Sequence, residues 1–278
     1  MKIFLTGATG FLGYHFVNVA VSQGHEVLCL KRPTSVSLFE PIVEEKIKWV
    51  NTDEQLYNVI SLFAPEMLFH SAWGGVRGNG RNDYETQKDN FIMSKHLFRL
   101  YAYKQIISIG SQAEYGIYTG PISENHPLNP ENEYAKAKIA TCNELQRIAE
   151  VNDIEWQWIR IFTLFGEKQK AGLISVAASQ FLDGVKEFPT TEGKQIYNYM
   201  YSFDFAKAIC KILGSKGTSG IYNLAQSFVD DYSNKQILEK IKGITNSNTK
   251  IKYGEIAYVA NQVMMMTANI SKYESVFG

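Results

Sequence analysis

The sequence predicts an α/β fold built on a doubly wound parallel sheet, with a small C-terminal lobe. Apolar runs of strand length alternate with stretches of helical periodicity across residues 1–165, and such alternation is typical of parallel strands joined by helices that cover both faces of the sheet. A glycine-rich turn separates the first run from the first helical stretch. Beyond Phe165 the alternation breaks up, which indicates a smaller and less regular part of the chain.

The first element is the apolar run 2–7, which ends in glycine and predicts a strand, and helical spacing over 11–23 predicts the helix after it. Further strands are expected at 25–32, 47–50, 66–70, 105–110, 155–162 and 220–225. Further helices are expected at 53–63, 84–103, 132–151, 172–184 and 203–213. We expect residues 1–165 and 200–226 to form the sheet domain, and residues 166–199 and 227–278 to form a small lobe over its carboxyl edge, where open parallel sheets bind ligands.

Charge and composition narrow the class of protein. Lys plus Arg and Asp plus Glu each number 28, so no net field favours nucleic acid as a partner. The three cysteines are widely spaced, a pattern that indicates neither a disulfide framework nor a metal site. No apolar stretch reaches the roughly 20 residues of a spanning helix, so we expect no membrane partner and a cytoplasmic location.

The turn "TGATGFLG" at residues 6–13 lies between the first strand and the first helix. Glycines at this place let backbone N–H groups at a helix N-terminus approach a pyrophosphate, so the turn favours dinucleotide binding. The expected contacts are Gly7, Thr9, Gly10, Phe11, Leu12 and Gly13.

The end of the second strand indicates which dinucleotide binds. An NAD-binding chain commonly has a carboxylate about 20 residues beyond the glycines, where it accepts hydrogen bonds from the ribose. Here that region holds Lys31 and Arg32. Two adjacent cations attract a ribose 2′-phosphate, which a carboxylate would repel. The pair favours NADP(H) as the cofactor.

A tyrosine, a lysine and a serine suggest proton-transfer chemistry. Tyr134 and Lys138 are four residues apart on a predicted helix, so they share one face. Ser111 follows a predicted strand and precedes Tyr134 by 23 residues in the segment "GSQAEYG". A tyrosine exchanges protons near neutral pH only when a nearby cation stabilises its phenolate, and Lys138 supplies such a charge.

These motifs together resemble the extended short-chain dehydrogenase/reductase family of nucleotide-sugar epimerases, dehydratases and reductases. The resemblance implies a Rossmann domain that binds NADP(H), a catalytic triad of Ser111, Tyr134 and Lys138, and contacts from Tyr134 and Lys138 to the cofactor. It also implies a homodimer formed through the helices at 84–103 and 132–151. In the segment "GSQAEYG", Gly110 replaces a serine that is usual in the family.

Further segments resemble the family through most of the chain. "LFHSAW" at 68–73 implies cofactor contacts from His70, Ser71 and Ala72, and Asn90 matches an asparagine that begins a helix near the family's active site. The expected contacts to a nucleotide-sugar substrate are Trp73, Arg77, Gln112, Phe162 and Tyr197. Tyr197 and Asn198 replace a usual Arg and Asp, so another cation, among Lys170, Lys186 and Lys194, is expected to hold the diphosphate.

The choice within the family rests on Gln112 and Ala113. Dehydratases of the family carry an acid and base pair at these positions, and neither residue here exchanges protons. We therefore expect an NADPH-dependent reductase of a nucleotide-linked 4-keto-6-deoxyhexose, similar to the dTDP-fucose, CDP-abequose and CDP-paratose synthases. A nucleotide-sugar epimerase and a non-catalytic protein that senses NADP(H) are the alternatives.

Overall fold

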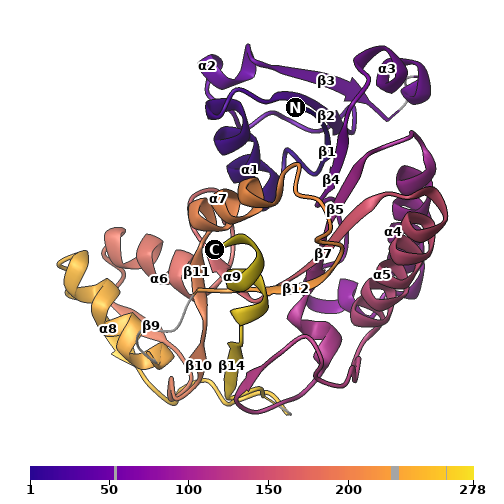
Figure 1. The fold of residues 1–278 in the computed structure, drawn as a ribbon. Helices are drawn as coiled ribbons and strands as arrows, with labels where there is room; N and C mark the ends of the chain where they lie inside the picture. Colours follow the sequence, from indigo (N-terminus) through magenta and orange to yellow (C-terminus); the bar gives the residue numbers. More distant parts are fainter. Residues whose placement is uncertain (53–54, 227–231, 261) are drawn as a thin grey trace.

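The computed structural model describes residues 1–52, 55–226, 232–260 and 262–278. Its centre is a seven-stranded sheet in which every pairing is parallel, in the order β12-β7-β5-β4-β1-β2-β3 (Figure 1). The strands are β1 (Lys2–Thr6), β2 (Glu26–Lys31), β3 (Ile47–Asn51), β4 (Met67–His70), β5 (Gln105–Ser111), β7 (Glu155–Ile161) and β12 (Gly220–Leu224). This arrangement confirms the predicted doubly wound parallel sheet.

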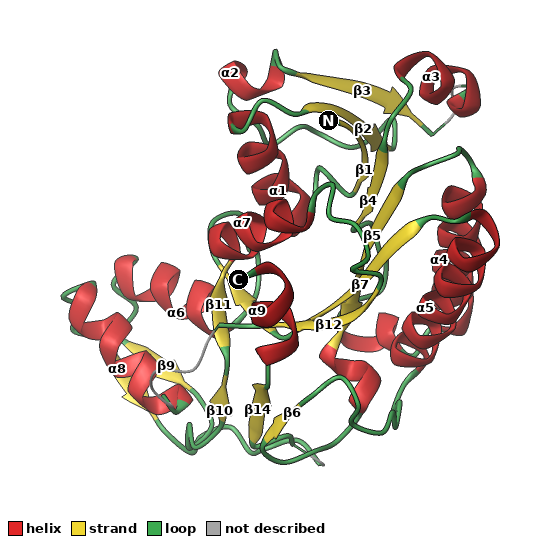
Figure 2. Cartoon of the chain, in the orientation of Figure 1, coloured by secondary structure: helices red, strands yellow, loops and turns green. Residues whose placement is uncertain are grey.

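The strands are buried on both faces because their apolar side chains alternate between two cores. In β1, Ile3 and Leu5 point into one core and Phe4 into the other. The first core is covered by α1 (Phe11–Ser22), α7 (Ser202–Ile212) and α9 (Ser271–Phe277). The second is covered by α3 (Leu56–Phe63), α4 (Tyr84–Arg99) and α5 (Glu133–Asn152). Figure 2 shows α4 and α5 side by side along one edge of the molecule.

Several short strands and two further helices lie beyond the central sheet and the helices that cover it. β8 (Thr163–Phe165) pairs with β11 (Tyr199–Tyr201), β9 (Glu187–Pro189) with β13 (Lys250–Lys252), and β14 (Met265–Ala268) with both β10 (Ile196–Tyr197) and β6 (Pro121–Ile122). Helices α6 (Leu173–Leu182) and α8 (Asn234–Ile244) pack on each other through an apolar cluster that includes Phe181 and Leu238. Figure 1 shows α6 and α8 together, away from the seven-stranded sheet.

The proposed division into two parts stays a prediction, and the last helix bears on it. Although α9 falls within the predicted small lobe, Tyr273 is buried in the core of the large sheet and its hydroxyl donates to the Ala208 carbonyl at 2.7 Å. The predicted start of the lobe segment at 227, and that of the helix at 53, lie outside the described residues. A short helix, α2 (Pro41–Glu44), was not expected from the sequence.

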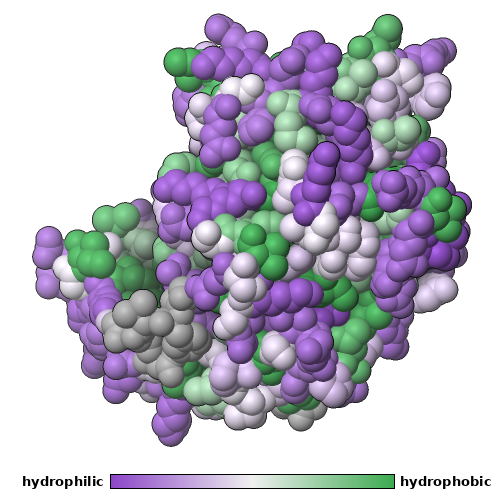
Figure 3. All heavy atoms as spheres, in the orientation of Figure 1, coloured by the Kyte–Doolittle hydropathy of each residue, from purple (hydrophilic) through white to green (hydrophobic). Residues whose placement is uncertain are grey.

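The surface seen in Figure 3 is mostly hydrophilic, with hydrophobic residues scattered between polar ones. Among the described residues, no helix combines the length and the apolar character that crossing a bilayer requires.

Candidate active site

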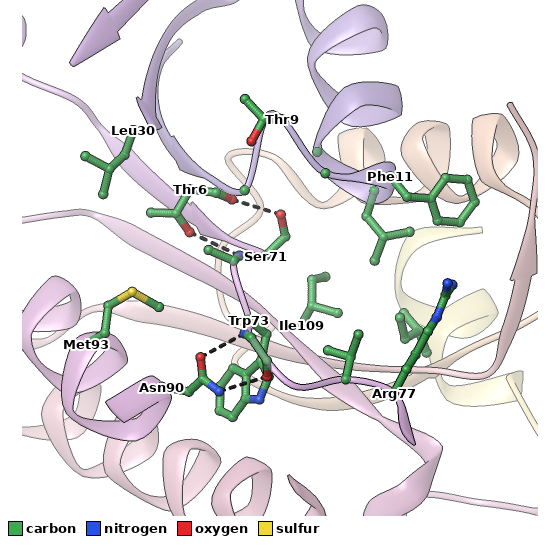
Figure 4. A pocket seen from close by; sticks show the side chains of 18 of the residues that line it. Thr6, Thr9, Phe11, Leu30, Ser71, Trp73, Arg77, Asn90, Met93 and Ile109 are labelled. Carbon is green, nitrogen blue, oxygen red and sulfur yellow. Dashed lines mark hydrogen bonds between the residues drawn. The ribbon is translucent and has the colours of Figure 1, made fainter. Parts of the chain in front are cut away.

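A cleft of about 760 Å³ opens at the carboxyl ends of the central strands. Its position, beside the point where the sheet order reverses between β1 and β4, is where doubly wound folds bind nucleotides. Of the predicted residues, those that line it are Gly7, Thr9, Gly10, Phe11, Leu12, Gly13, Lys31, Arg32, Ser71, Ala72, Trp73, Arg77, Asn90, Tyr134, Lys138 and Phe162. Figure 4 shows several of them around the opening.

The glycine turn forms one wall of the cleft, and its shape requires glycine. Gly7 has φ +87°, and a Cβ there would lie 2.7 Å from Ser71 Oγ. A Cβ on Gly13 would lie 2.2 Å from the Gly7 carbonyl oxygen, so a side chain would push α1 away from β1. Gly10 caps α1 without a side-chain hydrogen bond. The first turn of α1 therefore offers backbone N–H groups to an anion, and the cradle fits a dinucleotide pyrophosphate.

Lys31 and Arg32, the basic pair at the end of β2, line the same cleft as the glycine turn. Lys31 ends β2, with its Nζ 4.9 Å from the centre of the Trp49 ring, and Arg32 is exposed beside it. Ser35 and Thr52 line the same end of the cleft, and no carboxylate of the described residues lines it. Two cations and two hydroxyls form a donor set that suits a phosphate.

His70 lies behind the cleft wall and does not line the cleft. Its Nδ1 is 2.7 Å from Thr6 Oγ1, and its Nε2 is 2.9 Å from Ser94 Oγ. Since the Ser94 hydroxyl donates to the Asn90 carbonyl, the His70 Nε2–H donates to Ser94. Burial lowers the pKa of His70 to about 3, so the ring is neutral. The ring ties β4 to β1 and α4, which differs from the expected contact with the cofactor.

The tyrosine and lysine of α5 meet the end of β5, as their spacing predicts. Tyr134 is 8% exposed, so burial raises the pKa of its phenol, and the nearby Ser111 side chain acts against this shift. Lys138 lies one turn further along α5, with its Nζ 5.9 Å from the centre of the Tyr134 ring. The structure thus brings the three predicted catalytic residues together, but Tyr134 and Lys138 line the cleft whereas Ser111 does not.

Lys138 is almost fully buried at the wall of the cleft. It is 4% exposed, its Nζ donates to the Ile109 carbonyl at 2.7 Å, and it stands 3.5 Å from the centre of the Trp73 ring. Burial lowers the pKa of Lys138 to about 7, and the Glu114 carboxylate acts against this shift. A lysine with a pKa in this range exchanges its proton near neutral pH.

A buried ion pair holds the backbone beneath Ser111. Glu114 accepts hydrogen bonds from the Ser111 N–H at 2.8 Å, from Trp158 Nε1 at 3.0 Å and from Arg160 Nε at 2.7 Å. Glu114 and Arg160 are 0% and 2% exposed. A Cβ at position 110 would lie 2.2 Å from Trp158 Nε1, so the packing of Trp158 gives a steric reason for glycine at this position.

Comparison with known proteins bears on this arrangement. A family model described as the NAD dependent epimerase/dehydratase family matches residues 3–225. The chain belongs to this family. It is an NAD(P)-dependent enzyme of the extended short-chain dehydrogenase/reductase type, as the motifs predict.

Three relatives show how far the family likeness extends. CDP-abequose synthase of Salmonella muenchen is 26% identical, over 97% of this chain and 89% of its own length. dTDP-6-deoxy-L-talose 4-dehydrogenase (NAD(+)) of Aggregatibacter actinomycetemcomitans is 27% identical, over 80% and 83%. The crystal structure of UDP-glucose 4-epimerase from Thermotoga maritima with UDP-glucose superposes with a TM-score of 0.85 at 20% identity, over 99% and 92%.

Two of the residues expected to contact a family substrate do not line the cleft, namely Gln112 and Tyr197. The Tyr197 hydroxyl donates to the Val263 carbonyl at 2.9 Å and accepts from Gln262. Both of its hydrogen bonds are therefore made within the protein. Arg77 reaches across the cleft mouth and donates to the Ala171 carbonyl at 3.1 Å. Lys194 pairs with Glu192, while Lys170 is exposed near the cleft residue Gln169.

Sequence reasoning missed several residues that line the cleft. Ser35 follows the basic pair by three residues, so a search for hydroxyls near Arg32 could have found it. Thr52 directly follows β3 and gives no signal in the sequence, because its place depends on the pairing of β2 with β3. Ile161, Leu164 and Gln169 enter the cleft in the same way, through the fold.

Proposed function

We propose that the protein is an NADPH-dependent reductase of a nucleotide-linked 4-keto-6-deoxyhexose, giving the NDP-6-deoxyhexose by reduction at C4. CDP-abequose synthase, which matches nearly the whole chain, supports this choice. So does the similarity to a dTDP-6-deoxy-L-talose 4-dehydrogenase. The nucleotide and the configuration at C4 are open in this proposal.

The observation that carries the proposal is the basic end of the cleft. Lys31 and Arg32 line it together with Ser35 and Thr52, and no carboxylate of the described residues stands among them. A cation pair favours the 2′-phosphate of NADP(H) over the free ribose of NAD. NADPH suits a net reduction, whereas an epimerase usually returns each hydride to its substrate and retains NAD.

The roles of the residues follow from their environment. Bound NADPH would supply the hydride. The Ser111 hydroxyl would donate a hydrogen bond to the substrate oxygen at C4, and Tyr134 would give that oxygen its proton. Lys138 would stabilise the resulting phenolate and hold the nicotinamide ribose. The glycine turn would bind the pyrophosphate, and Trp73, Arg77 and Phe162 would enclose the sugar nucleotide.

The neighbourhood of Ser111 argues against dehydration. Loss of water needs an acid and a base beside the catalytic hydroxyl, where this chain has Gln112 and Ala113. Glu114 is the nearby carboxylate, but its oxygens are bound by Ser111, Trp158 and Arg160, and it is fully buried. It is therefore unavailable to a substrate.

The test is to incubate the protein with NADPH or NADH and a panel of dTDP-, CDP- and GDP-4-keto-6-deoxy sugars. We expect net oxidation of NADPH with one of them, faster than with NADH, and loss of nearly all turnover in Tyr134→Phe. Product analysis would identify the sugar. A fully active Tyr134→Phe variant would remove Tyr134 from proton transfer.

The second candidate is a nucleotide-sugar epimerase, because the family includes epimerases and the same triad can remove a proton as well as donate one. An epimerase would purify with tightly bound NAD and would interconvert sugars without net cofactor turnover. A non-catalytic NADP(H) sensor would bind the cofactor but reduce no sugar in the panel.

The proposal includes a cytoplasmic homodimer with a nucleotide sugar as its small-molecule partner. Helices α4 and α5 pack on each other and present Ile92, which is 53% exposed, on their outer surface. Sedimentation at micromolar concentration tests the dimer, and a monomer there would contradict it.

A further inference from the structure

The loop that connects β4 to α4 is folded tightly against α4. Gln87 of α4 donates from its amide to the Gly75 carbonyl at 3.1 Å and to the Gly80 carbonyl at 2.7 Å. Asn90, one turn later, accepts from the Gly74 N–H at 2.9 Å and donates to the Gly74 carbonyl at 3.0 Å (Figure 4). Two buried amide side chains therefore hold both ends of the loop.

The backbone conformation of this loop requires glycine at positions 75 and 80. Gly75 has φ +64°, and a Cβ on it would lie 2.6 Å from both Gln87 Nε2 and the Gly80 carbonyl oxygen. A Cβ on Gly80 would lie 2.8 Å from the Gly75 Cα. Gly75 and Gly80 are in close contact, so tight packing fixes the path of the loop up to Gly80. It thereby also fixes the position of Arg81, the next residue.

The consequence is that two loop residues cover the predicted catalytic pair. Trp73, whose indole donates to Gln87 at 2.8 Å, lies over Lys138. Arg81 lies over Tyr134, with its guanidinium carbon 4.8 Å from the centre of the phenol ring. Within the described part of the chain, no carboxylate forms an ion pair with Arg81. Its charge is directed at the ring.

We propose that Arg81 is a positioning residue for proton transfer, acting through Tyr134 by stabilising the phenolate that remains after the proton has left. The proposal rests on the role of Tyr134 in the proposed function. A cation over an aromatic ring is attracted by the electron density of its face, and this attraction grows when the ring becomes an anion. Arg81 therefore favours the ionised tyrosine.

The other groups that face Tyr134 leave room for this contribution. Burial raises the pKa of Tyr134, and the Glu114 charge raises it further, while the Ser111 hydrogen bond and Arg81 lower it. Lys138, from the same helix, has a pKa of about 7 and is not fully charged above neutral pH. A guanidinium stays protonated throughout, so Arg81 keeps its charge in the range where Lys138 loses it.

The experiment compares Arg81→Met with Arg81→Lys by following the ionisation of Tyr134 itself. The protein is labelled with a fluorinated tyrosine, whose phenol is more acidic, and the ¹⁹F resonance of Tyr134 is assigned by its loss in Tyr134→Phe. We expect the ionisation midpoint to rise by about one pH unit in Arg81→Met and by less in Arg81→Lys. Arg99→Met, the same substitution on the outer face of α4, should leave the midpoint unchanged.

Two results would overturn the role of Arg81: an equal midpoint in wild type and Arg81→Met, or a wild-type Tyr134 that stays protonated up to alkaline unfolding. This readout needs no substrate, so it is separate from the proposed function. If Tyr134→Phe is inactive and Arg81→Met leaves the Tyr134 midpoint unmoved, the role of Arg81 alone is rejected. A fully active Tyr134→Phe would instead reject the function of Tyr134 on which the inference rests.

Discussion

Replacing Gly110 by alanine tests the packing of Trp158 and Glu114 against the strand end that carries Ser111. The backbone of Gly110 has no positive φ, so alanine suits it, and Gly→Ala at such positions usually stabilises a protein by about 0.4–1 kcal/mol through the unfolded state. The added Cβ, however, would lie 2.2 Å from Trp158 Nε1 and 2.7 Å from Glu114 Oε1. Packing therefore predicts the opposite sign.

The expected cost follows from what must move. Trp158 and Glu114 are both 0% exposed, so neither can give way into solvent. Overpacking of a core costs about 1–3 kcal/mol, and weakening one hydrogen bond to the Glu114 carboxylate adds about 1.5–3 kcal/mol. After the gain from the unfolded state is subtracted, we expect Gly110→Ala to lose about 1.5–5.6 kcal/mol of unfolding free energy.

Urea unfolding of Gly110→Ala, alone and in a Trp158→Phe background, measures this cost. Removing the indole removes the nearest atom, so the alanine should cost less in that background. Gly243→Ala serves as the matched control, because Gly243 lies in α8 with nothing within 4 Å of an added Cβ. We expect it to gain stability. An unchanged or stabilised Gly110→Ala, or an equal cost in both backgrounds, would refute the packing argument.

Two further predictions concern charge. Lys31→Asp should weaken NADPH binding by about 10- to 100-fold and NADH binding much less, as measured by fluorescence titration. Lys48→Asp, on the neighbouring strand and outside the cleft, should weaken the binding of neither cofactor. Equal losses for both cofactors in Lys31→Asp would contradict the contact between Lys31 and the 2′-phosphate. The pKa of Lys138 is about 7 in the folded protein, against an ordinary lysine value of 10.5 that applies to the unfolded chain. Between these two pH values the unfolded chain holds the proton and the folded protein does not. The free energy of unfolding therefore rises with pH, by up to about 1.4 kcal/mol per pH unit. Unfolding free energies between pH 7 and 8.5 should show this rise in wild type relative to Lys138→Met, and parallel curves would contradict it.

The large sheet could be predicted because its strands are continuous apolar runs. Ile3, Phe4 and Leu5 are buried on both faces of the sheet, and such runs are visible without knowledge of their partners. The short strands were missed for the opposite reason. β6 has two residues and forms only by pairing with β14, which lies more than 140 residues later in the chain. No local sequence pattern therefore predicts it.

The same distinction applies to the site. Tyr134 and Lys138 share a helix face, and the glycine turn is contiguous, so local spacing places both. The burial of Glu114 against Trp158 and Arg160 depends on the pairing of β5 with β7. That is why Gly110 reads in the sequence only as a departure from the family pattern, whereas in the structure it has a steric reason.

The residues proposed to choose the cofactor and those proposed to transfer the proton come from different parts of the sheet. Lys31 ends β2, whereas Ser111 ends β5, and β1 and β4 lie between them. Three strand spacings amount to roughly 14 Å, beyond the Debye length of about 8 Å at physiological salt. Under the proposed function, the charge of Lys31 would act on the cofactor phosphate with little effect on Tyr134, whose pKa is raised by burial and by Glu114 and lowered by Ser111 and Arg81. If both proposals hold, substitutions at the end of β2 would exchange one dinucleotide for another, while the loop that carries Arg81 would keep the proton-transfer chemistry intact.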